Sequence, residues 1–122
     1  IRRQRQMCIR DRFVRRMEDF AFEDQRKKVR RHARKLPLEG LSDKLCLVIL
    51  DILHQGRAKY TAIKAALSQN DPFDALLSIG LNTYHDRIAT LRAGILDLER
   101  KGIVGKRVYS DDAGDFIPAV DA

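Results

Sequence analysis

The feature that most restricts the fold is a long amphipathic segment, residues 83–101, that runs into two short strand-like segments. Its apolar residues recur at alternating steps of four and three, which is the spacing of one face of a helix. Gly102 is the expected helix end, and 103–104 is expected to start a short β element. Residues 106–109 and 116–120 have the character of strands around a turn at 110–115. The expected apolar face of the helix consists of Tyr84, Ile88, Leu91, Ile95 and Leu98.

Three shorter helices are expected before this one. The first covers 42–55, where apolar residues recur at i, i+3, i+4, i+7 and i+8, with Ser42 as N-cap and Gly56 just past the end. The second covers roughly 59–68. Asp71 is suited to cap a third helix at 73–79, and Pro72 suits its first position. For the long helix, the spacing of Thr83 and Asp86 predicts a capping box.

The first residues are treated separately, because 2–12 resemble the translation of a transposon-mosaic-end sequencing adapter over their whole length. We therefore interpret 1–12 as an unstructured artefact and exclude it from the fold analysis. If the gene was assembled from short sequencing fragments, the C-terminal end of the protein is also expected to be truncated. The formal net charge is 24 − 17 = +7. Five arginines and one aspartate in 1–12 contribute 5 − 1 = +4, which leaves +3 for the remainder. The overall charge is therefore a weak guide to partners.

Residues 13–38 are interpreted as a polar N-terminal helix or arm, and 39–122 as the folded domain. Val29, Ala33 and Leu36 fall at i, i+4 and i+7, so a helix with a thin apolar stripe is expected, ended by Pro37. The strongly basic part of this segment is 26–35. We favour a solvated helix or arm. The alternative is an arm that contacts DNA phosphates or takes part in a dimer interface.

Several functional classes are disfavoured by residue types and their spacing. Cys8 and Cys46 are too few for a disulfide framework, and Cys46, in an apolar helix, is expected to be an inert core residue. The longest apolar run, 45–50, is far shorter than the ~20 residues of a membrane span. No secretory leader is visible, so a cytoplasmic protein is expected. The three histidines, His32, His54 and His85, lack partners at metal-ligand spacing, and there is no glycine-rich phosphate loop. We therefore expect no enzyme, catalytic residue, metal, cofactor or identifiable small-molecule ligand.

The order of elements, three to four helices followed by a hairpin, is the layout of a winged helix-turn-helix. Residues 89–104, which end Leu-Glu-Arg-Lys-Gly-Ile-Val, resemble the end of a recognition helix running into the first wing strand of that superfamily. Residues 56–63 resemble the connection into its second helix. The likeness spans about 42–120 and leaves the subfamily open. It implies a mainly α fold with a small hairpin and a transcriptional regulator that binds double-stranded DNA as a homodimer, because one helix reads few bases.

The face of the long helix opposite the apolar seam supplies the candidate DNA-reading residues. Ala89 and Ala93 are small enough to let the helix approach base edges, and His85 and Thr90 have hydrogen-bonding groups. The helix N-terminus favours phosphate. The base-reading candidates are Thr83, His85, Asp86, Ala89, Thr90 and Ala93, and the phosphate candidates are Lys59, Lys64, Arg87, Arg92, Lys106 and Arg107.

Acidic residues favour a second interpretation. The wing turn holds Asp111, Asp112 and Asp115, and Asp86 and Asp97 lie on the reading face, where phosphates would repel them. The alternative is a winged helix used as a protein–protein interaction module without DNA binding. The stretch 70–82 is also longer than a tight helix-turn-helix connection. Either the helix at 59–68 or the one at 73–79 is therefore a candidate for the positioning helix.

Overall fold

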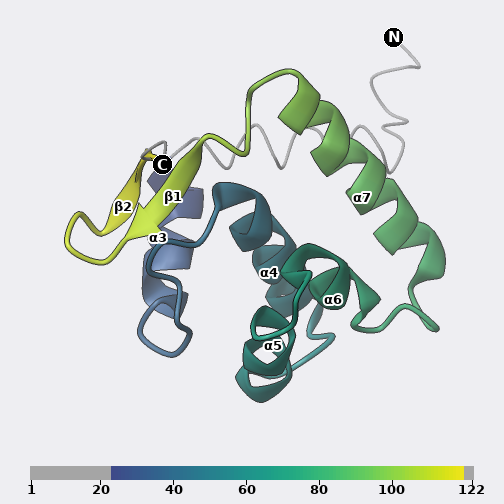
Figure 1. The fold of residues 1–122 in the computed structure, drawn as a ribbon. Coiled ribbons are helices and arrows are strands. Elements are labelled where there is room, and N and C mark those ends of the chain that lie inside the picture. Colours follow the sequence, from purple (N-terminus) through teal and green to yellow (C-terminus); the bar gives the residue numbers. More distant parts are fainter. Residues whose placement is uncertain (1–22, 120–122) are drawn as a thin grey trace, which may run out of the picture.

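The computed structural model describes the backbone of residues 23–119 and the side chains from residue 27 onward. The expected artefact at 1–12, and the part of the N-terminal arm before residue 23, lie outside these residues. The described chain is mainly helical and ends in a two-stranded antiparallel hairpin, which confirms the expected fold class at this level (Figure 1). Its elements are α3 (Glu23–His32), α4 (Asp43–Gln55), α5 (Tyr60–Leu67), α6 (Pro72–Ser78), α7 (His85–Arg100), β1 (Arg107–Ser110) and β2 (Asp115–Pro118).

Helix α4 is the central element of the core, and its ends are defined by local chemistry. The Ser42 side chain accepts a hydrogen bond from the Lys44 amide, and Gly56 takes the left-handed conformation at φ 69° that ends the helix. Both caps were predicted correctly. Helix α6 begins as expected too, with Pro72 in its first turn and the Asp71 carboxylate accepting from the Asp74 amide. The bounds of α4 and α6 therefore follow from short-range sequence signals.

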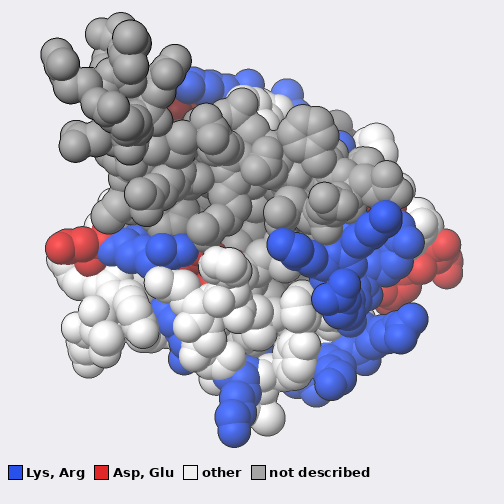
Figure 2. Space-filling model, turned by 180° about the vertical axis from the view of Figure 1, so that it is seen from behind, with Lys and Arg blue, Asp and Glu red and all other residues white. Residues whose placement is uncertain are grey.

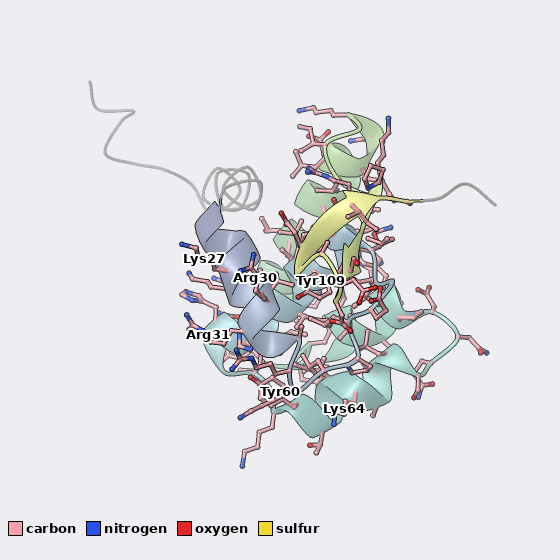
Figure 3. All side chains as sticks on the ribbon, turned by 90° about the vertical axis from the view of Figure 1, so that its left-hand side faces the viewer. Lys27, Arg30, Arg31, Tyr60, Lys64 and Tyr109 are labelled. Atoms are coloured by element: carbon pink, nitrogen blue, oxygen red, sulfur yellow. The ribbon has the colours of Figure 1, made fainter. Side chains whose placement is uncertain are left out.

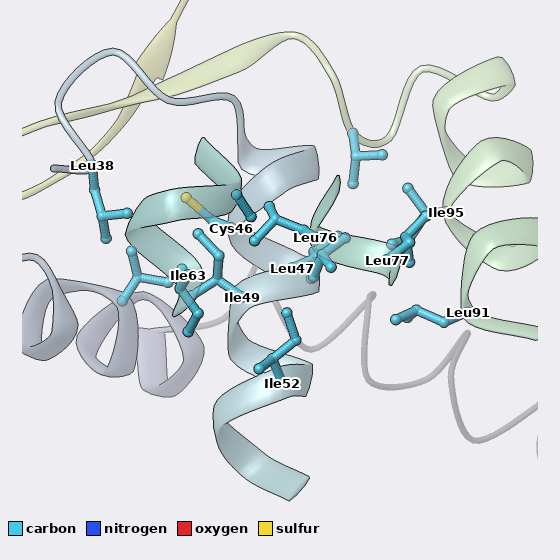
Figure 4. Close-up of a cluster of buried hydrophobic side chains, with 14 of the residues drawn as sticks. Leu38, Cys46, Leu47, Ile49, Ile52, Ile63, Leu76, Leu77, Leu91 and Ile95 are labelled. Atoms are coloured by element: carbon cyan, nitrogen blue, oxygen red, sulfur yellow. The ribbon is translucent and has the colours of Figure 1, made fainter. Parts of the chain in front are cut away.

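The core lies where α4, α5, α6 and α7 meet (Figure 4). Ile88, Leu91, Ile95 and Leu98 of α7 are each at most 2 % exposed, which confirms that part of the predicted seam. Tyr84 is the exception, because it precedes the helix and is 37 % exposed. Burying such an apolar stripe is the main stabilising contribution of an amphipathic helix. The other helices contribute, among others, Ile49 and Ile52 from α4, Ile63 from α5, and Leu76 and Leu77 from α6.

Helix α3 packs against this same core. Val29 on α3, and Leu36 and Leu38 in the segment after it, are buried together with the core residues of α4. The helix ends at His32, five positions before Pro37, which was expected to end it. Arg30 Nε donates to the Gly114 carbonyl in the hairpin turn at 2.8 Å. The α3 segment is therefore attached to α4 on one side and to the hairpin on the other.

The hairpin is paired to the segment that precedes α4. Strand β1 pairs with β2 in a register that places Val108 opposite Ile117. Ser42 forms an isolated antiparallel bridge with Val108. The Tyr109 amide donates to Leu41, and the Gly40 amide donates to Tyr109. Backbone pairing thus joins two segments that are more than 60 residues apart, and it fixes the hairpin against the helices.

Besides the end of α3, two local predictions were wrong. The capping box does not form: Tyr84 is the N-cap residue of α7, it makes no side-chain cap, and the Thr83 and Tyr84 amides both donate to Gly80 in a preceding turn. This turn occupies the residues that the capping box needs. Residues 103–104 lie in a turn rather than a β element. The two expected strands do form, as Arg107–Ser110 and Asp115–Pro118. The first lies one residue later than expected, and the second begins one residue earlier and ends two residues earlier.

Candidate nucleic-acid interface

The side of α7 opposite its apolar seam is open to solvent. His85, Asp86, Ala89 and Ala93 are exposed on successive turns, and Thr90 is half-buried at the edge of this side. Thr83 is exposed as well, but it lies in the turn before the helix. The structure therefore brings four of the six base-reading candidates onto one helical surface, with only alanine side chains in its middle.

The two arginines that flank this surface are bound to carboxylates of the same chain. Arg87 Nη2 lies 2.8 Å from Asp51 Oδ1, and Arg92 Nη2 lies 2.7 Å from Asp74 Oδ1. The Arg92 guanidinium also lies 5.7 Å from the centre of the Phe73 ring. Each arginine thus has an internal counter-charge, and a phosphate would have to compete with it. Through this ion pair Arg87 connects α7 to α4, so its main role is to stabilise the packing of these two helices.

The remaining phosphate candidates are not grouped around that surface. Lys59 and Lys64 are exposed on or beside α5, whereas Lys106 and Arg107 follow the C-terminal end of α7. A helix of 16 residues is about 24 Å long at 1.5 Å per residue. Lys106 and Arg107 are therefore separated from His85 by roughly the length of α7, and any contact they make involves a different stretch of a ligand.

A buried charge cluster that sequence reasoning missed joins α4 to α7. The carboxylate of Asp51 is 2 % exposed and lies between two guanidinium groups, 2.8 Å from Arg87 and 3.0 Å from the fully buried side chain of Arg57. Arg57 also donates to Gln55 Oε1, and its guanidinium lies 6.0 Å from the Tyr84 ring centre. The available signal was Asp51 itself, a carboxylate inside the apolar repeat of α4. Of the two arginines that pair with it, Arg57 comes just after α4, and Arg87 lies 36 residues away on α7.

A groove of about 540 Å³ runs between α6 and α7, and it includes part of the candidate reading surface. Leu81 and Leu96, each 38 % exposed, are among its apolar walls. The Arg92–Asp74 ion pair lies at its edge. Sequence periodicity assigned Leu96 to neither the seam nor the reading face. The full lining is Asp74, Leu77, Ser78, Leu81, His85, Ile88, Ala89, Arg92, Ala93 and Leu96.

The electrostatics of α7 differ between its two ends. At the C-terminal end, hydrogen bonding from the Lys101 side chain, followed by that from Arg100, holds the pKa of the Asp97 carboxyl below its usual value. These two cations are thereby paired within the helix. At the N-terminal end no side chain caps the first amides of the helix. There the exposed Asp86 has its Oδ1 3.4 Å from His85 Nδ1. Taken over its length, the exposed side of α7 is close to neutral.

No protein-family model matches this chain, and no curated protein or solved structure shows significant similarity to it. Within residues 23–119, no helix is long and apolar enough to cross a membrane. The same part of the chain contains no cluster of three His, Cys, Asp or Glu side chains arranged to hold a metal ion. Proposals about function therefore depend on the geometry described above.

Proposed function

We propose that this chain is a winged helix-turn-helix domain that binds double-stranded DNA, with α7 entering the major groove. The observation that carries the proposal is the exposed side of α7, which is free of bulky side chains at Ala89 and Ala93 and is followed by a hairpin. A helix with this profile can approach base edges closely. The side chains of His85 and Thr90 supply hydrogen-bonding groups there.

The N-terminal end of α7 supports this placement. Because no side chain caps the helix, its first backbone amides are available to a phosphate oxygen, and the helix dipole favours a negative charge at this end. Lys106 is exposed beyond the other end of the helix and is suited to a phosphate farther along the duplex. Because one helix reads few bases, we propose that the domain acts as a homodimer in transcriptional regulation.

The proposal is tested by placing a carboxylate in the middle of the reading surface. Ala89→Glu should weaken binding to a duplex selected from a random library, because the new charge would face phosphates and base acceptors. Ala65→Glu, the same change at an exposed position of α5, is the matched control and should bind as the parent chain does. Equal affinities for the parent and the Ala89→Glu protein, measured by fluorescence anisotropy, would refute α7 as the reading helix.

The α6–α7 groove favours a second candidate function, a protein–protein interaction module. Its exposed Leu81 and Leu96, and the internal pairing of Arg87 and Arg92, suit an apolar partner better than a polyanion. The two functions differ in their salt dependence, since DNA affinity falls steeply with salt and apolar docking does not. Leu96→Glu should abolish salt-insensitive association with a second copy or another protein, as measured by sedimentation. If Leu96→Glu leaves such association unchanged, the groove is not the docking site.

A further inference from the structure

We propose that the basic side of α3 is a second surface of this protein and that it binds the phosphate backbone of duplex DNA. We name it the α3 ridge and define it by four exposed side chains, Lys28 and Arg31 on α3 and Arg34 and Lys35 in the turn that follows it. It is independent of α7, because α4 lies between α3 and α7 (Figure 1). The inference therefore holds or fails separately from the proposed role of α7.

The ridge is held in place by the fold rather than carried on a loose arm. Val29, between two of the basic positions, is 1 % exposed and packs into the core. His32 Nδ1 lies 2.8 Å from the Tyr60 hydroxyl of α5, and Lys35 Nζ lies 5.5 Å from the centre of the same ring. On the other side of α3, the hydrogen bond from Arg30 to the Gly114 carbonyl connects the helix to the hairpin turn. Figure 3 shows Arg31 on α3 above Tyr60 of α5. A helix that is already held against the core loses less entropy on binding than a loose arm does.

The charge of the ridge is not balanced within the described chain. Six of the nine residues from 27 to 35 are Lys or Arg, and no acidic residue occurs between 27 and 38. Among the described side chains, those of residues 27–119, none of the four ridge cations forms an ion pair, in contrast to Arg87, Arg92, Arg100 and Lys101. Figure 2 shows Lys and Arg side chains gathered on the side of the molecule where α3 lies. Like charges this close repel one another, and a polyanion would relieve that repulsion.

The shape of the surface also suits a phosphate backbone. A hollow of about 250 Å³ between α3 and α4 is lined by Lys28, Arg31 and His32 on its basic side and by Leu50 and Leu53 on the other. Lys28 and Arg31 lie three residues apart on α3, about 4.5 Å along its axis, and Arg34 and Lys35 lie in the turn that follows the helix. One DNA strand carries a charge every ~3.4 Å along the axis, so the spacing of Lys28 and Arg31 is close to that of neighbouring phosphates.

The test compares salt dependence between charge-matched variants of the full chain. The ridge variant is Lys28→Gln with Arg31→Gln, and the control is Lys44→Gln with Lys101→Gln, which removes two cations already paired with Glu99 and Asp97. Duplex affinity is measured by anisotropy from 50 to 200 mM salt. Each lost phosphate contact lowers the slope of log affinity against log salt by about 0.9, so the ridge variant should lose about 1.8. Between 50 and 200 mM salt, the factor by which affinity falls should therefore be about twelve times smaller for the ridge variant than for the parent chain. All variants share residues 1–12, so the arginines there cancel in the comparison.

The outcomes separate this proposal from the role of α7. A lower slope in the ridge variant, with the control unchanged, supports the α3 ridge even if Ala89→Glu binds normally. A ridge variant with the parent slope overturns it, whatever Ala89→Glu does. Binding of the parent chain to anionic phosphatidylserine vesicles but not to the duplex would overturn it as well. If the double variant unfolds, Lys28→Gln alone should lower the slope by about 0.9.

Discussion

Removing the charge of Asp51 is the sharpest test of how this fold is held together. In Asp51→Asn the Arg57 guanidinium, whose side chain is fully buried, would lose the carboxylate 3.0 Å away, and Arg87 would lose its partner at 2.8 Å. Removing one partner of a buried ion pair costs about 3–5 kcal/mol, because the remaining charge stays out of water. Domains of this size are stable by about 5–15 kcal/mol, so this loss would remove about a fifth or more of the free energy of unfolding.

Urea unfolding followed by circular dichroism measures this loss. The matched control is Asp74→Asn, which breaks the Arg92 pair at a similar distance but with side chains 42 % and 58 % exposed. Solvent screens that pair, so its loss should cost at most about 1 kcal/mol. The reasoning is refuted if the two aspartate variants unfold at the same urea concentration, because burial would then make no difference to the cost.

Three further predictions follow from the core and from α3. Ile95→Ala should lower the free energy of unfolding by about 2–5 kcal/mol in urea titrations, because Ile95 is fully buried; a loss below 1 kcal/mol would contradict the packing described. Burial, followed by the charges of Arg31 and Lys35, lowers the pKa of His32. The unfolded chain then binds the proton more readily, so stability should fall as the pH drops below about 6.5. His32→Gln should remove this part of the pH dependence, and an unchanged profile would count against it. Burial raises the pKa of the Cys46 thiol, so in a Cys8→Ser variant, where Cys46 is the one remaining cysteine, it should react with a thiol reagent only in denaturant; fast labelling of that native variant would disprove its burial.

Local sequence patterns predicted the helices where short-range physics dominates. The repeat around Ile49 and Ile52 placed α4, and Ser42 and Gly56 placed its ends, because caps involve only neighbouring residues. The seam of α7 was predicted for the same reason. The capping box at Thr83 failed because a turn closed by Gly80 occupies the residues that it needs.

The amino-acid sequence by itself determined the number, order and inward faces of the main helices, since helical periodicity and capping act over a few residues. Only the tertiary structure decided which charges remain available. Arg87 and Arg92 look alike as flanking cations in the sequence, yet each meets a carboxylate from another helix. The basic residues of α3 look like a solvated run, yet Val29 and Tyr60 hold the helix in place. Partners that are tens of residues apart meet only after packing, and no local pattern encodes that distance.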